Sequence, residues 1–380
     1  MDKRFNGKRL KEARIYRGMT GEDLAKKVGC KRQTLSMYEL GKSQPVDKDT
    51  IQKISRVLDF PSKFFYEEDR ETTGGTVYFR ALLTTNKKYR TEQNVKMNFI
   101  SQIYSMLQDY IQFPECVMPD FSEDVTPEKA AYALRDAWGL GRSPIDNLIT
   151  IVERHGILVT SFSTSTNDVD AFSRLIKSDD SSTFVIAYSN NKTSAARIHF
   201  DIAHELGHIC LHDWNEDIDD LTREEFKQRE QEANEFAAAF LLPATSFKRD
   251  ALAGTQTLGR YQKLKEKWKV SIAAMIRRAE KLGVMDWEKY QFLIRDMQKR
   301  GLRKHEPLDD TLMTAGPALL KAAVMMLLQE NVFTPEEFMR ELSDQYDLSI
   351  NPTEVEYLLD LPKGTLSTFK IIDFKNLSIK

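Results

Sequence analysis

The stretch from Ala203 to His208 constrains the fold of this chain most, because it reads Ala-His-Glu-Leu-Gly-His. Its two histidines stand four positions apart, so on an α-helix both imidazoles project from nearly one face, about 6 Å apart along the axis. Two imidazoles placed in this way can hold one zinc ion. Glu205 follows about 100° around the helix, where its carboxylate can take a proton from a metal-bound water. The stretch therefore predicts a metallopeptidase centre with His204 and His208 as metal ligands and Glu205 as the catalytic base.

The flanking residues predict that this helix is buried. The apolar residues around the motif cover most of the helix girth: Ile198, Phe200, Ile202, Ala203, Leu206, Ile209 and Leu211. A helix that is apolar all round lies in a core, and buried histidines need polar partners. The alternative, two exposed histidines on an amphipathic helix, fits this pattern less well. A chance match is also rare, since a chain of this length with only 6 histidines should contain one in roughly one case per hundred.

A second predicted helix, over residues 229–243, offers the third ligand. Glu230 and Asn234 lie one turn apart on one face, so the carboxylate can complete the ligand set while the amide orients a ligand imidazole. Glu232 is the alternative ligand on the same helix. His212 lies four positions after His208, one turn too far along for ligation. Catalytic zinc keeps three protein ligands and one open position, so we expect His212 to support the site without binding the ion.

With these two motifs the chain resembles the ImmA/IrrE family of metallopeptidases. The resemblance rests on His-Glu-Leu-Gly-His at residues 204–208 and on the run Glu-x-x-Ala-Asn-x-Phe-Ala-Ala that starts at Glu230 and leads to Leu-Leu-Pro. It extends over about residues 127–300. It implies a compact α+β peptidase domain that binds one zinc ion, or another divalent metal, through residues matching His204, His208 and Glu230, with Glu205 as general base. Members of the family cleave transcriptional repressors that carry a helix-turn-helix domain.

The amino-terminal part of the chain predicts a small helical domain with a basic surface. Apolar residues recur at three- and four-residue spacing and predict helices over residues 8–17, 21–28, 32–40 and 47–58, and a short one after Pro61. Thr20 fits a helix N-cap, and Gly29 fits a helix end. From Lys3 to Arg32 there are eleven Lys or Arg against three acidic residues. Such an excess of positive charge is typical of nucleic-acid binding.

This segment resembles the XRE, or lambda-repressor-like, helix-turn-helix family over about 60 residues. The resemblance makes residues 32–40 the recognition helix that enters the major groove of double-stranded DNA. It implies that four early side chains face base edges and phosphates, and that two lysines contact the backbone. The four are Arg32, Gln33, Thr34 and Ser36, and the lysines are Lys31 and Lys42. The alternative is a protein-binding module with a basic solvated face.

The rest of the chain completes a multidomain prediction. We expect an all-α helix-turn-helix domain over residues 1–68 and a linker and helical connector over 69–125, and then the α+β metallopeptidase domain over 126–300. Its β-rich runs, 156–160, 171–176 and 183–188, predict a small, three-stranded, mainly antiparallel sheet. Further amphipathic helices predict a helical C-terminal module over 301–380, with a regulatory or oligomerisation role.

Composition indicates a cytoplasmic protein without a membrane segment. The amino terminus is basic and polar with no apolar signal region, and no run approaches 18 apolar residues. The three cysteines are few and scattered, which argues against a disulfide framework.

Together these features predict a DNA-binding, zinc-dependent endopeptidase that regulates transcription by cleaving a repressor or antitoxin-like protein. A homodimer would match a pseudo-palindromic operator. Two alternatives remain open. One is a non-enzymatic transcription factor whose metallopeptidase-like domain senses a metal, peptide or metabolite. The other is a protein-binding module in a toxin-antitoxin or phage-defence complex.

Overall fold

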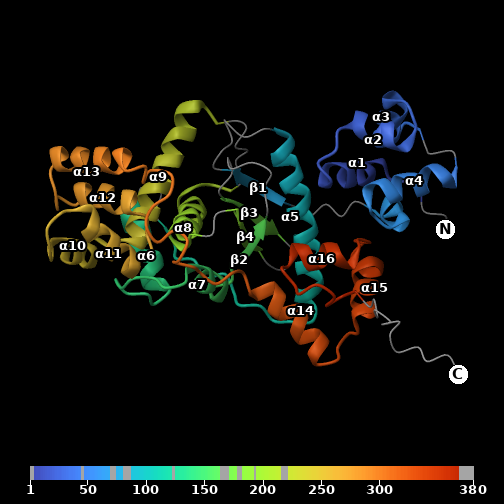
Figure 1. The fold of residues 1–380 in the computed structure, drawn as a ribbon. Helices are drawn as coiled ribbons and strands as arrows, with labels where there is room; N and C mark the ends of the chain where they lie inside the picture. Colours follow the sequence, from blue (N-terminus) through green and yellow to red (C-terminus); the bar gives the residue numbers. More distant parts are fainter. Residues whose placement is uncertain are drawn as a thin grey trace, which may run out of the picture. The chain divides into compact units, whose positions relative to one another are not determined.

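The computed structural model describes residues 4–43, 47–68, 74–79, 87–121, 125–162, 171–177, 182–191, 194–214 and 221–367 (Figure 1). The chain divides into two compact units. Unit 1 comprises Met1–Thr72, Asn86–Gln112 and Leu320–Lys380, and unit 2 comprises Thr73–Thr85 and Phe113–Leu319. Unit 2 is thus inserted twice into the chain of unit 1. The boundaries predicted at residues 68, 125 and 300 remain predictions.

The described part of unit 1 is helical. Its elements are α1 (Gly7–Tyr16), α2 (Gly21–Val28), α3 (Arg32–Glu39), α4 (Lys48–Leu58), the 3-10 helix η1 (Ser62–Tyr66), α5 (Lys87–Gln108), α14 (Leu319–Gln329), α15 (Pro335–Gln345) and α16 (Pro352–Leu358). Thr20 caps α2 in a reciprocal pair with Asp23, and Gly29 ends it at a φ of 82°, in the left-handed region that glycine adopts without strain. Helices α2 and α3 therefore form the predicted helix-turn-helix.

Within unit 1, α5, α16 and the segment before α16 pack on α1 and on the residue that follows η1. The ring of Tyr16 in α1 stacks on that of Phe99 in α5, with centroids 5.2 Å apart. The Tyr16 hydroxyl also donates to Glu354 in α16 at 2.5 Å, and Arg17 pairs with the same carboxylate at 2.6 Å. The carboxylate of Glu67 is buried and accepts hydrogen bonds from the backbone and side chain of Ser349. Three separate stretches of chain thus build one unit.

Unit 2 contains a sheet and the helices that cover it. The strands are β1 (Gly74–Phe79), β2 (Leu158–Phe162), β3 (Ala171–Lys177) and β4 (Ser182–Ser189), and the helices are α6 (Pro127–Ala137), α7 (Leu148–Arg154), α8 (Ala195–Leu211), α9 (Arg223–Leu241), α10 (Ala244–Leu252), α11 (Leu258–Trp268), α12 (Ile272–Lys281) and α13 (Trp287–Lys299). Helix α8 packs against β3 and β4, and α9 packs along α8 (Figure 1). The predicted multidomain fold class, with an α+β domain between helical parts, is confirmed.

The sheet differs from its prediction in strand number. The described residues form four strands in the order β1-β3-β4-β2, not three. The additional strand, β1, lies where a linker was predicted, and it pairs antiparallel with β3. The pair β3/β4 is antiparallel, whereas β2 and β4 are parallel. Strands β2 and β4 run in the same direction because β3, which runs in the opposite direction, lies between them in the sequence.

A buried ionic cluster anchors the start of α8. The ammonium group of Lys265 is fully buried and lies 2.8 Å from Glu306 and 2.7 Å from Asp309. Asp309 in turn accepts a hydrogen bond from Ser194, the residue before α8, at 2.8 Å. Buried charges that are paired and hydrogen-bonded in this way resist displacement, because a lost partner leaves an uncompensated charge. The cluster therefore fixes the entry of the helix that carries the histidine motif.

Candidate metal centre

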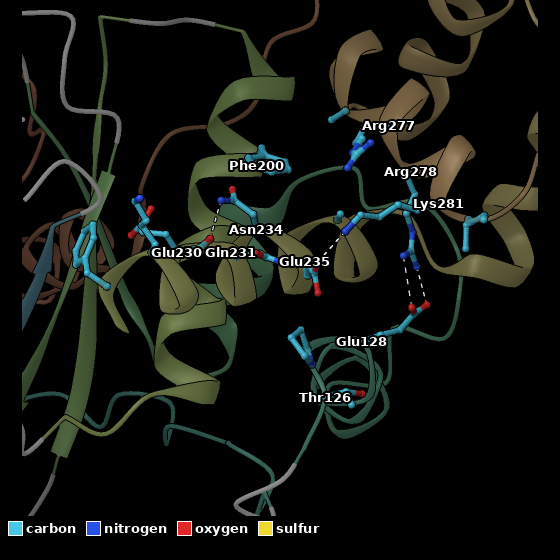
Figure 2. A pocket seen from close by; sticks show the side chains of 16 residues that line it. Thr126, Glu128, Phe200, Glu230, Gln231, Asn234, Glu235, Arg277, Arg278 and Lys281 are labelled. Carbon is cyan, nitrogen blue, oxygen red and sulfur yellow. Dashed lines mark hydrogen bonds and ion pairs between the residues drawn. The ribbon is translucent and has the colours of Figure 1, made fainter. Parts of the chain in front are cut away.

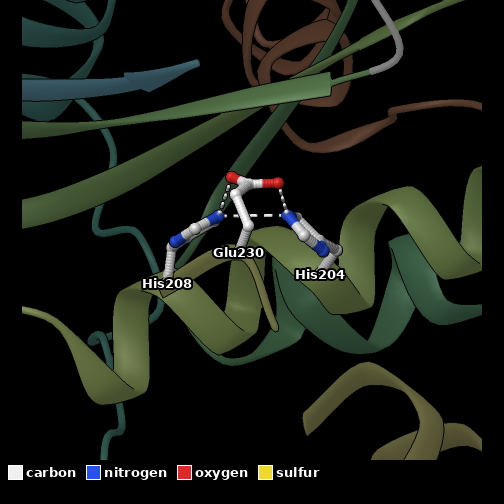
Figure 3. Close-up of side chains that lie close together, drawn as sticks. All are labelled: His204, His208 and Glu230. Atoms are coloured by element: carbon white, nitrogen blue, oxygen red, sulfur yellow. Dashed lines mark hydrogen bonds and ion pairs between the residues drawn. The ribbon is translucent and has the colours of Figure 1, made fainter. Parts of the chain in front are cut away.

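Three side chains from two helices converge on one point in unit 2. His204 and His208 project from α8, and Glu230 reaches them from α9 (Figure 3). The two Nε2 atoms are 3.0 Å apart. The Glu230 oxygens lie 3.5 Å from Nε2 of His204 and 3.3 Å from Nε2 of His208. The structure thus brings together the three ligands predicted from sequence.

These distances fit a zinc ion. Zinc bonds to nitrogen and oxygen are about 2.0–2.1 Å long, so neighbouring ligands of a tetrahedral ion lie about 3.3–3.4 Å apart. The three observed separations, 3.0, 3.3 and 3.5 Å, bracket that value. Among the described residues the donor set is two imidazoles and one carboxylate, which is the number of protein ligands found in catalytic zinc sites.

Asn234 orients the imidazole of His204. Its Oδ1 lies 3.2 Å from Nδ1 of His204, and its Nδ2 donates to the Glu230 carbonyl at 2.6 Å. Since the amide oxygen can only accept, Nδ1 of His204 must carry the proton, and the Nε2 lone pair faces the other ligands. The predicted supporting role of Asn234 agrees with this geometry.

A second chain of hydrogen bonds orients His208. Its Nδ1 lies 2.9 Å from Nδ1 of His212, and Nε2 of His212 lies 3.2 Å from Glu232. Because Glu232 accepts from His212, the remaining His212 nitrogen is an acceptor for the Nδ1 proton of His208. Burial and the nearby His208 lower the pKa of His212 to about 3, in keeping with a neutral ring. Glu232, the alternative ligand, contacts His212 here.

Glu230 is ionised at neutral pH. Burial alone raises the pKa of its carboxyl group, but hydrogen bonds and positive charge from the protonated forms of His204 and His208 outweigh burial and lower the pKa to about 2. A bound metal ion would take the place of those protons, since imidazoles that bind a metal are neutral. A carboxylate in contact with two imidazole nitrogens is the form that binds a cation.

Glu205 is fully buried beside the ligands. The hydroxyl of Ser173 in β3 donates to its Oε2 at 2.5 Å. This bond joins the sheet to the metal helix and sets the direction of the carboxylate. A buried carboxylate held next to a metal-ligand set can serve as a general base.

Comparison with protein families agrees with both resemblances found in the sequence. Residues 152–280 match the IrrE N-terminal-like domain, and residues 10–65 match a helix-turn-helix family. The chain joins a helix-turn-helix domain to an IrrE N-terminal-like domain. No curated protein matches the chain. Within the described residues, no helix is long and apolar enough to cross a membrane. The chain is thus a DNA-binding regulator with a peptidase-like domain.

The glycine of the motif permits α8 and α9 of the IrrE N-terminal-like domain to approach closely. A Cβ added to Gly207 would lie 2.9 Å from the Cα and 3.1 Å from the carbonyl oxygen of Ala233. Both atoms belong to the backbone of α9, which carries Glu230. Any larger residue at position 207 must therefore move one helix away from the other.

We expect Gly207→Ala to destabilise the domain by about 1–3 kcal/mol, the usual range for overpacking, and to weaken metal binding by displacing Glu230. Urea unfolding and metal titration measure the two effects. Gly259→Ala is the matched control, since Gly259 in α11 has nothing within 4 Å of an added Cβ. That control should keep or raise stability, because alanine favours helices. Equal stability of the two variants would contradict the close-approach argument.

The helix-turn-helix domain presents its predicted DNA residues to solvent. Arg32, Gln33 and Ser36 are exposed on α3, and Thr34 is half-buried. Lys31 precedes α3 and Lys42 follows it, and both are exposed. Leu35 and Tyr38 on the opposite face are buried in unit 1. The structure therefore leaves the predicted recognition face accessible.

Two parts of the site were not predicted from sequence. Ser173 contacts Glu205, the predicted general base, from a strand more than thirty positions away, and a cavity beside Glu230 is lined in part by α12. The sequence offers only a weak signal for Ser173, a small polar residue between Phe172 and Arg174 in β3, and its burial is seen only in the structure. The cavity has no such local signal.

Proposed function

We propose that the IrrE N-terminal-like domain of this DNA-binding regulator is a zinc-dependent endopeptidase, and that its substrate is a repressor or antitoxin-like protein. The observation that carries the proposal is the convergence of His204, His208 and Glu230 next to the buried Glu205. A purely structural zinc site has four protein ligands, whereas the set found among the described residues has three. Family members that cleave helix-turn-helix repressors provide the substrate class.

In this proposal the two histidines and Glu230 hold the ion. Zinc supplies Lewis acidity when bound, which polarises a carbonyl group and makes a nearby water a better acid. Glu205 accepts the proton of the attacking water on a carboxylate oxygen and then delivers it to the leaving amine. Ser173 holds that carboxylate in place through Oε2. Asn234 and His212 keep the ligand nitrogens of the two imidazoles unprotonated and directed at the ion.

The direct test is cleavage of a proteome-derived peptide library by the zinc-loaded full chain, read by mass spectrometry. New peptide ends should appear at a consistent sequence, disappear with a chelator, and return on addition of zinc. A helix-turn-helix protein encoded beside this chain is the first full-length substrate to assay. Absence of any cleavage by fully zinc-loaded protein contradicts the enzyme proposal.

For the DNA-binding part we propose that α3 reads the operator through Arg32 and Gln33. Replacing each with Ala should cost about 1–3 kcal/mol per lost base contact and relax sequence preference. Replacing Lys42 with Ala should weaken binding to all sequences alike and reduce its salt dependence. Mobility shifts over a range of salt concentrations measure both. If the wild type shows no shift at low salt, the domain binds protein instead, and a dimer on a palindromic operator is ruled out with it.

A further inference from the structure

A large cavity begins at Glu230, one of the three candidate metal ligands. It has a volume of about 970 Å³ and lies between α9, α12 and the first residues of α6, with Phe200 of α8 on one side (Figure 2). Glu230 and Asn234 line one end, and Arg277, Arg278 and Lys281 line the other (Figure 2). Ligand pockets typically measure about 300–1,000 Å³. The cavity is therefore large enough for several residues of a peptide.

Apolar side chains form part of its wall near the ligands. Phe200 and Phe226 both line the cavity, and both are only partly buried although they pack against the core of unit 2. Leu282 does the same on the side of α12. Binding is favourable when apolar groups of a ligand cover exposed apolar surface inside a cavity, because that surface is removed from water. The part of the cavity near Glu230 therefore suits apolar side chains of a bound ligand.

At this end the residues that line the cavity carry three positive charges and two negative ones. Arg278 pairs with Glu128 at 2.7 Å, and Lys281 pairs with Glu235 at 2.8 Å, and all four residues line the cavity. Arg277 also lines it, but its partner at 3.1 Å is Glu280, which does not. The wall at this end thus favours an anionic group.

Aromatic rings hold Arg277 in position. Its guanidinium lies 5.4 Å from the ring centroid of Tyr290 and 5.9 Å from that of Trp287, and those rings stack on each other. A cation over an aromatic ring is attracted by the partial negative charge of the ring face. This attraction limits the motion of the Arg277 side chain. About half of the Arg277 side chain remains accessible, at 48% exposed.

We propose that this cavity binds the stretch of substrate peptide on one side of the scissile bond, and that Arg277 selects a stretch that carries an acidic side chain. The inference rests on the proposed peptidase function. A peptide fits better than a small acidic metabolite, because the cavity joins an apolar region near Glu230 to a cationic region at its other end.

Peptide hydroxamates test this preference without a need for cleavage, because the hydroxamate group anchors them at a bound metal. Two series are compared on the zinc-loaded full chain, with the hydroxamate at the amino end or at the carboxyl end of the peptide. In each series, matched peptides carry Asp or Asn at positions two to four residues from the hydroxamate. In one series the Asp peptides should bind about five- to tenfold more tightly, and the difference should shrink in high salt because exposed charges are screened.

Arg277→Gln should remove the preference, and Arg277→Glu should reverse it. Arg295→Glu is the matched control, since Arg295 is exposed on α13 and does not line the cavity. Thermal unfolding verifies that the variants are folded. If Arg277→Glu does not fold, Arg277→Gln still tests the preference, because glutamine keeps a long polar side chain. Equal binding of Asp and Asn peptides in both series overturns the proposal, as does a preference that persists in Arg277→Gln. If no hydroxamate binds the zinc-loaded chain at all, the metal-centre proposal fails, and this inference fails with it.

Discussion

Glu205→Gln should reduce peptide cleavage by at least about 10²-fold and leave the metal content unchanged. Glutamine keeps the length and shape of the side chain and still accepts the hydrogen bond from Ser173, but it has no carboxylate to take a proton. The variant should therefore bind about one equivalent of zinc and should bind DNA as the wild type does. Initial rates on the cleaved peptides and metal analysis of the same preparation measure the two properties.

Glu224→Gln is the matched control for this change, because Glu224 is exposed in the first turn of α9, away from the ligands. It should retain full activity. A Glu205→Gln protein that cleaves at the wild-type rate would show that Glu205 is not the base. The sensor alternative has its own signature in cells: Glu205→Gln regulates target genes like the wild type, whereas His204→Ala does not.

Removal of a ligand should have the second large effect. Glu230→Gln or His208→Ala should lower the bound zinc from about one equivalent to less than about 0.1 after dialysis, because two remaining ligands do not hold a catalytic zinc ion. The variants should also unfold at lower temperature than the zinc-loaded wild type. A ligand at 100 times its dissociation constant stabilises the folded state by about 2.7 kcal/mol, and this contribution is lost.

Glu232→Gln distinguishes the two candidate carboxylates. Glu232 contacts His212 and not the ligand nitrogens, so its amide variant should keep the ion with an affinity about 10- to 100-fold lower, as expected for a group that orients a ligand. Elemental analysis measures whether zinc is bound, and competition with a chelator measures how tightly each variant binds it. Full zinc content in Glu230→Gln with none in Glu232→Gln would reverse the assignment.

The parts of the site that were predictable are those set by helix periodicity. His204 and His208 share a face because they stand four positions apart, and Asn234 falls one turn after Glu230 for the same reason. The capped helices of the helix-turn-helix were predictable as well, since Thr20 and Gly29 mark the ends of α2. In each of these cases the deciding information lies within a few residues of chain.

The parts that were missed depend on distant stretches of chain. Strand β1 contains Gly74 and Gly75, which favour a turn or linker when considered alone, and its strand conformation comes from pairing with β3 about a hundred residues later. The amphipathic faces of α14–α16 show that these helices are covered but do not identify what covers them. The cavity lined by Arg277 likewise forms only when α12 is placed beside α9.

The contact between Tyr16 and Glu354 has a consequence for how the protein is made. These two residues are 338 positions apart in the chain. Ribosomes add about 5–20 residues per second, so Glu354 emerges roughly 17–70 s after Tyr16, and small domains fold much faster than that. The whole IrrE N-terminal-like domain is therefore synthesised, and has time to fold, before the DNA-binding unit receives its last helix. Synthesis that stops between the two would release a folded peptidase-like domain attached to an incomplete DNA-binding unit.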